Sequence, residues 1–253
     1  MSVDAIFDLL VLGWLAVAGA TFVALFFVAA PYGRHTRSGW GPTIGNRLGW
    51  IVMEAPAALV FAAAFVFGEH SRTPAALVFC GLWEAHYVHR AFIYPLGLRG
   101  RGRRMPVAVV GMALLFNGVN ACLNGCHVFS LSGGYPDWWL GDPRFIAGLG
   151  LFLTGFIVNR QADHTLRTLR EPGESGYQIP YGGLYRWVSC PNYLGEIVEW
   201  VGWAVATWSL PGLAFAVWTL ANLAPRALAH HAWYQAQFAD YPPERRALLP
   251  RLW

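Results

Sequence analysis

The sequence contains no lysine and is poor in charge of either sign. Charged residues make up 13% of the 253 residues, against roughly 25% in a typical soluble domain. Hydrophobic residues make up 56%, and the mean hydropathy is +0.38. Most of the surface must therefore face something other than water, which excludes an ordinary soluble domain. The 13 Trp and 10 Tyr fit this interpretation, because amphipathic rings collect at the two bilayer interfaces.

Other signatures are also missing. The cysteines lie in or beside apolar segments, so we expect buried thiols and no disulfide framework. No strand is predicted and no G-x-G-x-x-G follows one, so a Rossmann domain is unsupported. G-x-S-x-G and H-E-x-x-H are absent as well. Cys122 and Cys126-His127 lack a second ligand pair at zinc spacing, so no metal is predicted.

Seven mostly apolar stretches approach the ~20 residues that a bilayer-spanning helix needs. They are Ala5–Ala30, Leu48–Phe67, Pro74–Leu96, Met105–Ser130, Phe145–Asp163, Asn192–Trp208 and Leu210–Ala236. The first is too long for a signal-peptide core and lacks a basic n-region, so we expect no cleavage. Ser209-Leu210-Pro211 predicts a tight turn between the last two. We predict an all-α, polytopic membrane protein with seven transmembrane helices, in which residues 1–253 form a single domain.

The arginines predict the orientation of these helices. Of 18 arginines, 15 fall in the first, third and fifth loops or at the C-terminal end, whereas two fall in the second and fourth loops. Excess positive charge marks cytoplasmic loops. The N-terminus is therefore expected outside and the C-terminus in the cytoplasm. Because topology explains the arginines, nucleic-acid binding is not expected.

Ionisable residues within a membrane are candidate functional residues. Glu54 stands on an otherwise apolar span, and Trp83, Tyr87, Arg90 and Tyr94 recur along one face of the third span. A desolvated carboxyl group favours its neutral form, which donates a hydrogen bond. Glu54 and the Tyr87 hydroxyl can then hold a ketone oxygen and stabilise an enolate. The alternative is that the two side chains only satisfy each other at a helix interface.

A second polar group extends over the last three predicted spans and the Arg-rich loop that precedes them. Its residues repeat at helical spacing: Asn159, Asp163, Arg167 and Arg170; Asn192, Glu196 and Glu199; and Arg226, His230 and Tyr234. Arginine forks suit phosphate groups, so the set indicates a site for a large anionic ligand such as a nicotinamide dinucleotide. The alternative is a solvated helix end whose arginines only mark the cytoplasmic side.

The run Leu166–Trp200, LRTLREPGESGYQIPYGGLYRWVSCPNYLGEIVEW, closely resembles the C-terminal signature of the steroid 5α-reductases (3-oxo-5α-steroid 4-dehydrogenases). Further matching stretches follow in order along the chain: Met53–Pro56, His86–Pro95, Tyr135–Asp137, Ala206–Pro211 and Asp240–Pro242. The resemblance implies a seven-helix membrane fold. It also implies hydride transfer from NADPH to C5 of a 3-oxo-Δ4 steroid, followed by protonation at C4.

The resemblance also implies roles for individual residues. Glu54 and Tyr87 correspond to the pair that holds the 3-ketone, and Trp50 to a wall of the steroid pocket. Met53 stands where well-known animal members have Gln, which removes a polar contact near the ketone. The cofactor residues correspond to Asn159, Asp163, Arg170, Tyr177, Asn192, Glu196, Arg226, His230 and Tyr234, together with Tyr32, Arg90, Tyr94 and Arg101. Helices up to about residue 130 are expected on the substrate side, and residues from about 145 to 253 to bind NADPH.

The expected partners are a lipophilic steroid or enone that enters from the bilayer, NADPH from the cytoplasm, and membrane lipids. A monomer without a metal is expected, in the inner membrane if the source is a bacterium. Two other enzymes stay open: a reductase of another enone or a trans-2-enoyl thioester, and a membrane methyltransferase that uses S-adenosylmethionine. The methyltransferase has no use for Glu54 or Tyr87. A transporter or receptor leaves the Arg- and Tyr-rich loop unexplained.

Overall fold

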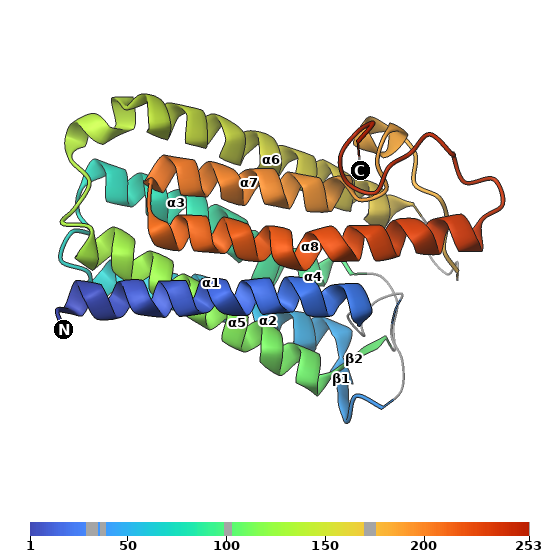
Figure 1. The fold of residues 1–253 in the computed structure, drawn as a ribbon, viewed down its shortest axis with the longest axis horizontal. Helices are drawn as coiled ribbons and strands as arrows, with labels where there is room; N and C mark the ends of the chain where they lie inside the picture. Colours follow the sequence, from blue (N-terminus) through green and yellow to red (C-terminus); the bar gives the residue numbers. More distant parts are fainter. Residues whose placement is uncertain (29–34, 36–38, 99–102, 170–175, 253) are drawn as a thin grey trace. The chain divides into compact units, whose positions relative to one another are not determined.

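A computed structural model describes the chain except for residues 29–34, 36–38, 99–102, 170–175 and 253 (Figure 1). Long α-helices dominate the described part, as predicted. They are α1 (Val3–Phe27), α2 (Asn46–Phe67), α3 (Pro74–Val88), α5 (Val107–Cys126), α6 (Pro143–Thr168), α7 (Pro191–Thr207) and α8 (Leu210–Gln237). Each begins within a few residues of the start of one predicted stretch, because the apolar run determines where a membrane helix can lie. Helix α3 ends at Val88, earlier than the predicted Leu96.

The length of the helices and their exposed apolar side chains are those of an integral membrane protein. Within the described residues, α1, α2, α6 and the segment Val107–Leu131 are long and apolar enough to cross a membrane. On α1, Leu9 and Leu10 are 56% and 60% exposed. Apolar side chains exposed along a whole helix have no favourable contact with water, whereas lipid tails satisfy them.

The described residues divide into two compact units. The first comprises Met1–Val11 and Ala30–Ile146, and the second comprises Leu12–Ala29 and Ala147–Trp253. Helix α1 is therefore divided between them. The predicted separation into a substrate side and a cofactor side stays a prediction.

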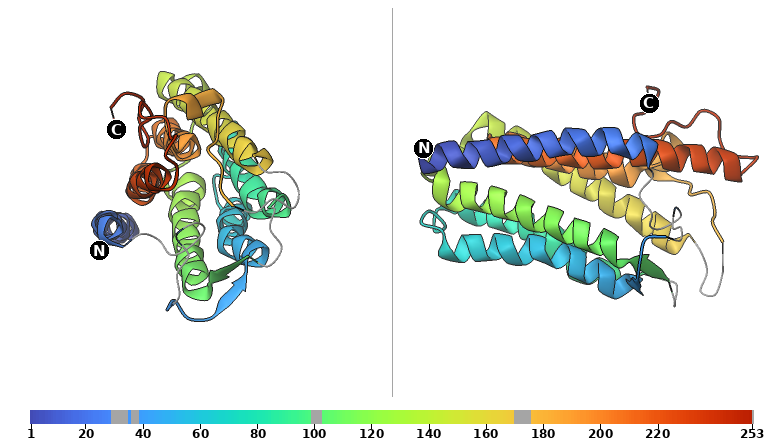
Figure 2. Two further views of the ribbon diagram at one scale, coloured as in Figure 1. Left: turned by 90° about the vertical axis from the view of Figure 1, so that its right-hand side faces the viewer. Right: turned by 60° about the horizontal axis from the view of Figure 1, so that its bottom comes forward.

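In the first unit, α2 packs along both α3 and α5 (Figure 2). Helix α3 continues through a π-helical turn, His89–Ile93, into the short helix α4, Tyr94–Leu96. The α2–α3 contact is aromatic: the rings of Phe61 and Trp83 stack with centroids 4.3 Å apart. The Trp83 indole N–H also donates to the Ala57 carbonyl at 2.9 Å, so both the apolar and the polar part of this side chain are satisfied.

Two short strands form a feature that the sequence did not predict. Strands β1 (Thr43–Gly45) and β2 (Arg104–Pro106) pair antiparallel. Arg104 Nε donates to Thr43 Oγ1 at 2.8 Å across the ribbon. Each strand has only three residues, which is too short to show the alternation by which a strand is recognised. The ribbon joins the starts of α2 and α5.

Asp142 fixes the start of α6. Its carboxylate accepts from the Arg144 backbone N–H at 2.8 Å and from the Arg144 guanidinium at 2.9 Å. These hydrogen bonds from Arg144 hold the pKa of the Asp142 carboxyl below its ordinary value. Aspartate is a favoured residue before the first turn, where backbone N–H groups need acceptors.

In the second unit, α6 and α7 approach each other through glycines spaced seven residues apart. A Cβ atom on Gly148 or Gly155 of α6 would lie within 3.0 Å of the α7 backbone. A Cβ atom on Gly195 or Gly202 of α7 would meet the α6 backbone equally closely. Small residues that let two backbones approach are typical of membrane helix pairs. This close approach puts polar side chains on α6 within reach of α7.

A tight turn joins α7 and α8, as predicted, but Trp208 and Ser209 form it, and Leu210 and Pro211 are already the first residues of α8. Trp208 ends α7 in the left-handed conformation, with φ 47°. Ser209 Oγ then accepts from the Gly212 backbone N–H at 3.1 Å, which caps α8. Helices α7 and α8 consequently run antiparallel, side by side (Figure 1).

Candidate functional site

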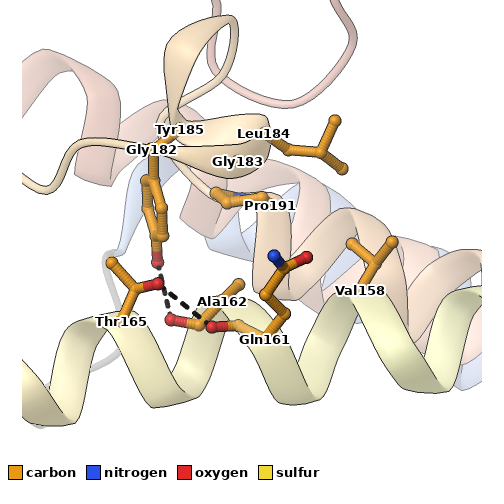
Figure 3. Close-up of a pocket in the computed structure, with 9 residues that line it drawn as sticks. All are labelled: Val158, Gln161, Ala162, Thr165, Gly182, Gly183, Leu184, Tyr185 and Pro191. Carbon is orange, nitrogen blue, oxygen red and sulfur yellow. Dashed lines mark hydrogen bonds between the residues drawn. The ribbon is translucent and has the colours of Figure 1, made fainter.

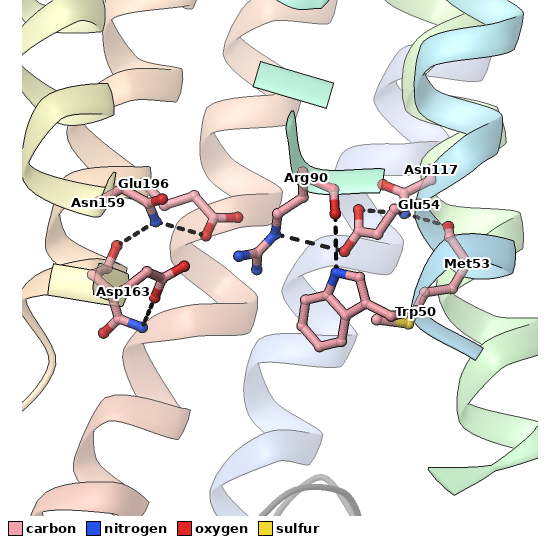
Figure 4. A network of polar contacts seen from close by, with 9 residues as sticks. Trp50, Met53, Glu54, Arg90, Asn117, Asn159, Asp163 and Glu196 are labelled. Atoms are coloured by element: carbon pink, nitrogen blue, oxygen red, sulfur yellow. Dashed lines mark hydrogen bonds and ion pairs between the residues drawn. The ribbon is translucent and has the colours of Figure 1, made fainter. Parts of the chain in front are cut away.

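In the first unit, the carboxyl group of Glu54 on α2 has a different partner at each oxygen (Figure 4). Asn117 Nδ2, on α5, donates to Oε2 at 3.2 Å. Arg90 Nε, in the π-helical turn, lies 3.8 Å from Oε1. The side chains of Arg90 and Glu54 are only 17% and 13% exposed. A carboxyl group in a membrane helix is thus held by one amide and one guanidinium.

Aromatic rings fix the position of Arg90. Its guanidinium lies 4.9 Å from the Trp50 ring centroid and 5.3 Å from the Tyr94 centroid. Trp50 Nε1 also donates to the Arg90 carbonyl at 3.2 Å. Met53 is buried in an apolar cluster with Met105. Trp50, Glu54, Arg90 and Tyr94 are therefore brought together, although Arg90 and Tyr94 were predicted as cofactor residues.

Tyr87 is buried on α3, at 3% exposure. Its ring lies 5.0 Å from Trp83 and 4.8 Å from His86. The helix that carries it packs along α2, which carries Glu54. Both side chains of the predicted ketone-binding pair therefore belong to the first unit.

In the second unit, α6 and α7 share a cluster of amide and carboxylate groups (Figure 4). Asn159 Nδ2 donates to the Asn192 carbonyl at 3.0 Å and lies 3.4 Å from Glu196 Oε2. Asn192 Nδ2 donates to Asp163 Oδ1 at 3.1 Å. Asn159 and Asp163 are both buried. The structure thus brings four predicted cofactor residues into one hydrogen-bonded group.

Helix α8 contributes two more predicted residues, which meet at a tyrosine of α7. Arg226 Nη2 donates to the Tyr193 hydroxyl at 3.0 Å, and that oxygen lies 3.0 Å from His230 Nε2. Tyr193 was not predicted as a site residue. Its position next to Asn192, in the first turn of α7, is a signal that could have found it.

Tyr234 and Tyr177 lie in an aromatic group of the same unit. The Tyr234 ring stacks on Tyr241 with centroids 5.3 Å apart and planes 10° apart. Tyr177 packs edge-on against Trp233, with centroids 4.9 Å apart. Tyr234 is 2% exposed, whereas Tyr177 is 38% exposed.

A second unpredicted network fastens the C-terminal segment beside these residues. Ser189 Oγ lies 2.6 Å from His231 Nδ1 and 2.7 Å from the Tyr241 hydroxyl. The Ser189 backbone N–H donates to the Arg246 carbonyl at 2.8 Å. Arg245 is 2% exposed and lies over the Tyr241 ring at 5.3 Å. No sequence pattern links residues that far apart.

Three predicted cofactor residues, Tyr32, Arg101 and Arg170, lie outside the described residues. A small pocket between α6 and the segment 182–191 contains none of the predicted site residues (Figure 3). There the Tyr185 hydroxyl donates to the Ala162 carbonyl at 3.4 Å. Within the described part of the chain, no group of three or more His, Cys, Asp or Glu side chains could hold a metal ion.

The two clusters differ in chemistry. Glu54 and Tyr87 belong to a largely apolar unit of aromatic and aliphatic side chains, which suits a lipophilic ligand with one polar oxygen. The second unit offers amides, carboxylates and the Arg226 guanidinium. Amides pair with a carboxamide, carboxylates accept from sugar hydroxyls, and arginine pairs with phosphate. This donor set fits a nicotinamide dinucleotide.

The comparisons with known proteins agree with the resemblance seen in the sequence. The family model described as 3-oxo-5-alpha-steroid 4-dehydrogenase matches residues 103–253. Steroid 5-alpha-reductase DET2 of Gossypium hirsutum is 43% identical over 242 residues, covering 92% of each chain. The human 3-oxo-5-alpha-steroid 4-dehydrogenase 1 is 39% identical over 239 residues, covering 94% of this chain and 92% of its own. The human 3-oxo-5-alpha-steroid 4-dehydrogenase 2 is 42% identical over 245 residues, covering 91% and 93%. The chain therefore belongs to the 3-oxo-5-alpha-steroid 4-dehydrogenase family, as an oxidoreductase that acts on CH–CH groups.

Proposed function

We propose that this protein uses NADPH to reduce the C4=C5 double bond of 3-oxo-Δ4 steroids, giving 5α-dihydro steroids. The observation that carries the proposal is the largely buried Glu54 side chain, 13% exposed, whose two carboxyl oxygens are contacted by Asn117 and Arg90. A fixed carboxyl group in an apolar helix bundle can hold the ketone of an otherwise apolar substrate. Family membership makes a steroid enone the first substrate class to test.

Glu54 and Tyr87 are the groups that we assign to the substrate ketone. As hydride adds to C5, negative charge develops on the 3-oxygen of the steroid. Two hydrogen bonds to that oxygen, from protonated Glu54 and from the Tyr87 hydroxyl, stabilise the enolate more than the ketone. The enolate then takes up a proton at C4. Trp50 and Met53 are proposed to line the substrate pocket.

NADPH, when bound, supplies the hydride. We assign its binding to the polar group of the second unit: Asn159, Asp163, Tyr177, Asn192, Glu196, Arg226, His230 and Tyr234, with Arg170, Tyr32 and Arg101 from outside the described residues. The Asn159 and Asn192 amides suit the carboxamide, and the arginines suit the phosphates. Arg90 and Tyr94, which contact each other and Trp50, are proposed as further cofactor residues.

The membrane arrangement follows from the same proposal. Seven helices span the bilayer, with the N-terminus outside and the cofactor residues on the cytoplasmic side, where NADPH is available. The steroid partitions into lipid and enters laterally. The protein works as a monomer, without a metal, and in the inner membrane if its source is a bacterium.

Turnover by the purified, detergent-solubilised protein tests the proposal. With NADPH and testosterone or progesterone, we expect NADPH oxidation and a product heavier by two hydrogens in mass spectrometry. Glu54→Gln and Tyr87→Phe should each lower turnover about 10²–10³-fold, the usual loss of one oxyanion donor. Thr154→Ala, which changes an exposed hydroxyl bonded to its own helix, is the control and should keep full activity.

Each failure has its own meaning. Saturable NADPH binding without steroid turnover would leave the cofactor assignment in place and indicate that the substrate is another enone. Full activity of both site variants would contradict the assignment of Glu54 and Tyr87. Absence of NADPH binding would contradict the proposal as a whole and make S-adenosylmethionine the next ligand to measure.

A further inference from the structure

Arg245, in the C-terminal segment, is a charged side chain buried inside the second unit, at 2% exposure. Its Nε and Nη1 atoms are buried, and no hydrogen-bond acceptor among the described residues contacts them. A buried charge without a partner is strongly unfavourable, so proteins normally pair it with an opposite charge or with a bound ion or water. Arg245 therefore points to an anion that the described part of the chain does not supply.

Two tyrosine rings enclose the Arg245 guanidinium. Its central carbon lies 4.8 Å from the Tyr181 ring centroid and 5.3 Å from the Tyr241 ring centroid. A ring face attracts the cation but leaves the N–H groups in the guanidinium plane free to donate to an acceptor. The rings thus hold the positive charge without satisfying its hydrogen bonds.

The two rings differ in how firmly they are held. Tyr241 is 7% exposed, its ring stacks on Tyr234, and its hydroxyl lies 2.7 Å from Ser189 Oγ. Tyr181 is 59% exposed. Tyr181 is therefore a cover that can turn away and open the guanidinium to a ligand.

The main chain around Arg245 is fixed as well. Its own N–H donates to the Pro242 carbonyl at 3.3 Å, and the Arg246 N–H donates to the Trp187 carbonyl at 2.9 Å. The Ser189 N–H donates to the Arg246 carbonyl at 2.8 Å. The cation is thus held in place before a ligand arrives, which lowers the entropic cost of binding.

We propose that Arg245 is the central residue of a binding site for a phosphate monoester, which enters when the Tyr181 ring turns away. A guanidinium matches phosphate oxygens in shape and in charge. A phosphate monoester carries close to two negative charges at neutral pH, and the adjacent, exposed Arg246 supplies a second positive charge. A nucleotide and a lipid head group can both carry such a phosphate. The inference goes beyond the proposed function, because it depends on neither Glu54 nor Tyr87.

Thermal unfolding of the full chain in detergent tests the site with inorganic phosphate, at an ionic strength held constant with chloride. The Tm of the native protein should rise with phosphate concentration, because a ligand of the folded state stabilises it. Arg245→Met should raise the Kd of phosphate at least about tenfold, since it removes hydrogen bonds from a charged donor. Arg246→Met, the matched control, removes an exposed and screened charge and should change the Kd less than about threefold. Equal Tm rises in the native protein and Arg245→Met would overturn the inference, as would no rise in the native protein.

Phenylglyoxal, a reagent for arginine, tests the site in protein that keeps Arg245. Tyr181→Ala removes the covering ring, so Arg245 should be modified faster than in the native protein, as measured by mass spectrometry of the C-terminal peptide. Inorganic phosphate should then slow the modification of Arg245 and leave that of Arg246 unchanged. Modification of Arg245 at the same rate with and without phosphate would overturn the inference.

Two further probes distinguish the sources of the phosphate. Adenosine 2′,5′-bisphosphate carries it on a nucleotide, and dihexanoyl phosphatidic acid carries it on a soluble lipid. The probe that raises the Tm of the native protein at the lower concentration, and raises it less in Arg245→Met, identifies the source. The inference fails if neither probe distinguishes the two proteins. An Arg245-dependent response to phosphate without any steroid reduction contradicts only the proposed function.

Discussion

Arg90 and Glu54 come from different helical segments and lie side by side, with Arg90 Nε 3.8 Å from Glu54 Oε1. The Trp50 and Tyr94 rings, at 4.9 and 5.3 Å from the guanidinium, hold the arginine in this place. A planar guanidinium uses such ring faces better than an ammonium group does. The charge beside the proposed ketone site is therefore oriented by aromatic packing.

Two replacements of Arg90 distinguish the contribution of its charge to kcat from the contribution of its planar shape. Arg90→Leu loses both the Glu54 contact and the ring contacts, and we expect kcat to fall about tenfold, which corresponds to about 1.4 kcal/mol. Arg90→Lys keeps the charge and loses the planar fork, so an intermediate kcat is expected. Steady-state kinetics of both variants check this, and an Arg90→Lys as impaired as Arg90→Leu would show that shape alone matters.

Loss of the Asn192–Asp163 hydrogen bond should weaken NADPH binding without changing steroid binding. Asp163→Ala removes the acceptor 3.1 Å from Asn192 Nδ2 and releases that amide. We expect the Kd of NADPH to rise about tenfold, since about 1.4 kcal/mol corresponds to a factor of ten. Steroid affinity should stay unchanged. Titration by fluorescence measures both, with the exposed Thr168→Ala on α6 as the control.

The glycines between α6 and α7 predict that two Gly→Ala variants of the same helix, α6, differ in stability. A methyl group at Gly155 would meet the backbone of Glu199, so Gly155→Ala must move the helices apart. We expect a loss of about 1–3 kcal/mol from overpacking. Gly150→Ala meets nothing within 4 Å and should be neutral or stabilising by about 0.5–1 kcal/mol.

Thermal unfolding in detergent compares the two glycine variants directly. A Gly155→Ala protein as stable as Gly150→Ala would contradict the close approach of α6 and α7. The same variant should also bind NADPH more weakly, because Asn159 and Asn192 belong to the two helices that are moved apart.

Ser189 predicts how firmly the C-terminal segment is held. Its hydroxyl lies between His231 Nδ1 and the Tyr241 hydroxyl, at 2.6 and 2.7 Å. Ser189→Ala leaves both partners without it, and we expect a loss of about 1–3 kcal/mol of stability, as for other buried polar groups that lose a partner. Tyr241→Phe should cost less, because its ring still stacks on Tyr234. Limited proteolysis of the C-terminal segment measures both, and equal protection in all three proteins would contradict the prediction.

The sequence predicted the helices well and their contacts poorly. The stretch predicted as Leu48–Phe67 is helical from Asn46 to Phe67, because hydropathy over ~20 residues determines where a membrane helix can lie. Hydropathy does not determine how a helix is rotated about its axis. The contact of Glu54 with Asn117, 63 residues further along the chain, depends on that rotation and was not predicted.

For the candidate site, helical spacing correctly grouped residues that lie on the same helix. It did not predict which residues of different helices contact each other. Asn159 with Asp163 and Asn192 with Glu196 follow a spacing of four, which places each pair on one face. Their joining across α6 and α7 depends on Gly155 and Gly195, whose seven-residue repeats with Gly148 and Gly202 were a usable signal. The contact of Ser189 with Tyr241 joins a loop to the C-terminal segment, and no local pattern encodes it.

In the proposed reaction, hydride passes from NADPH to C5 of a 3-oxo-Δ4 steroid. The most direct measurement is turnover of testosterone with NADPH that carries deuterium at the transferable C4 position, followed by location of the deuterium in the product by NMR. We expect one deuterium at C5, on the α face, and none at C4. Deuterium at C3 of an alcohol product, or a product without deuterium, would contradict it.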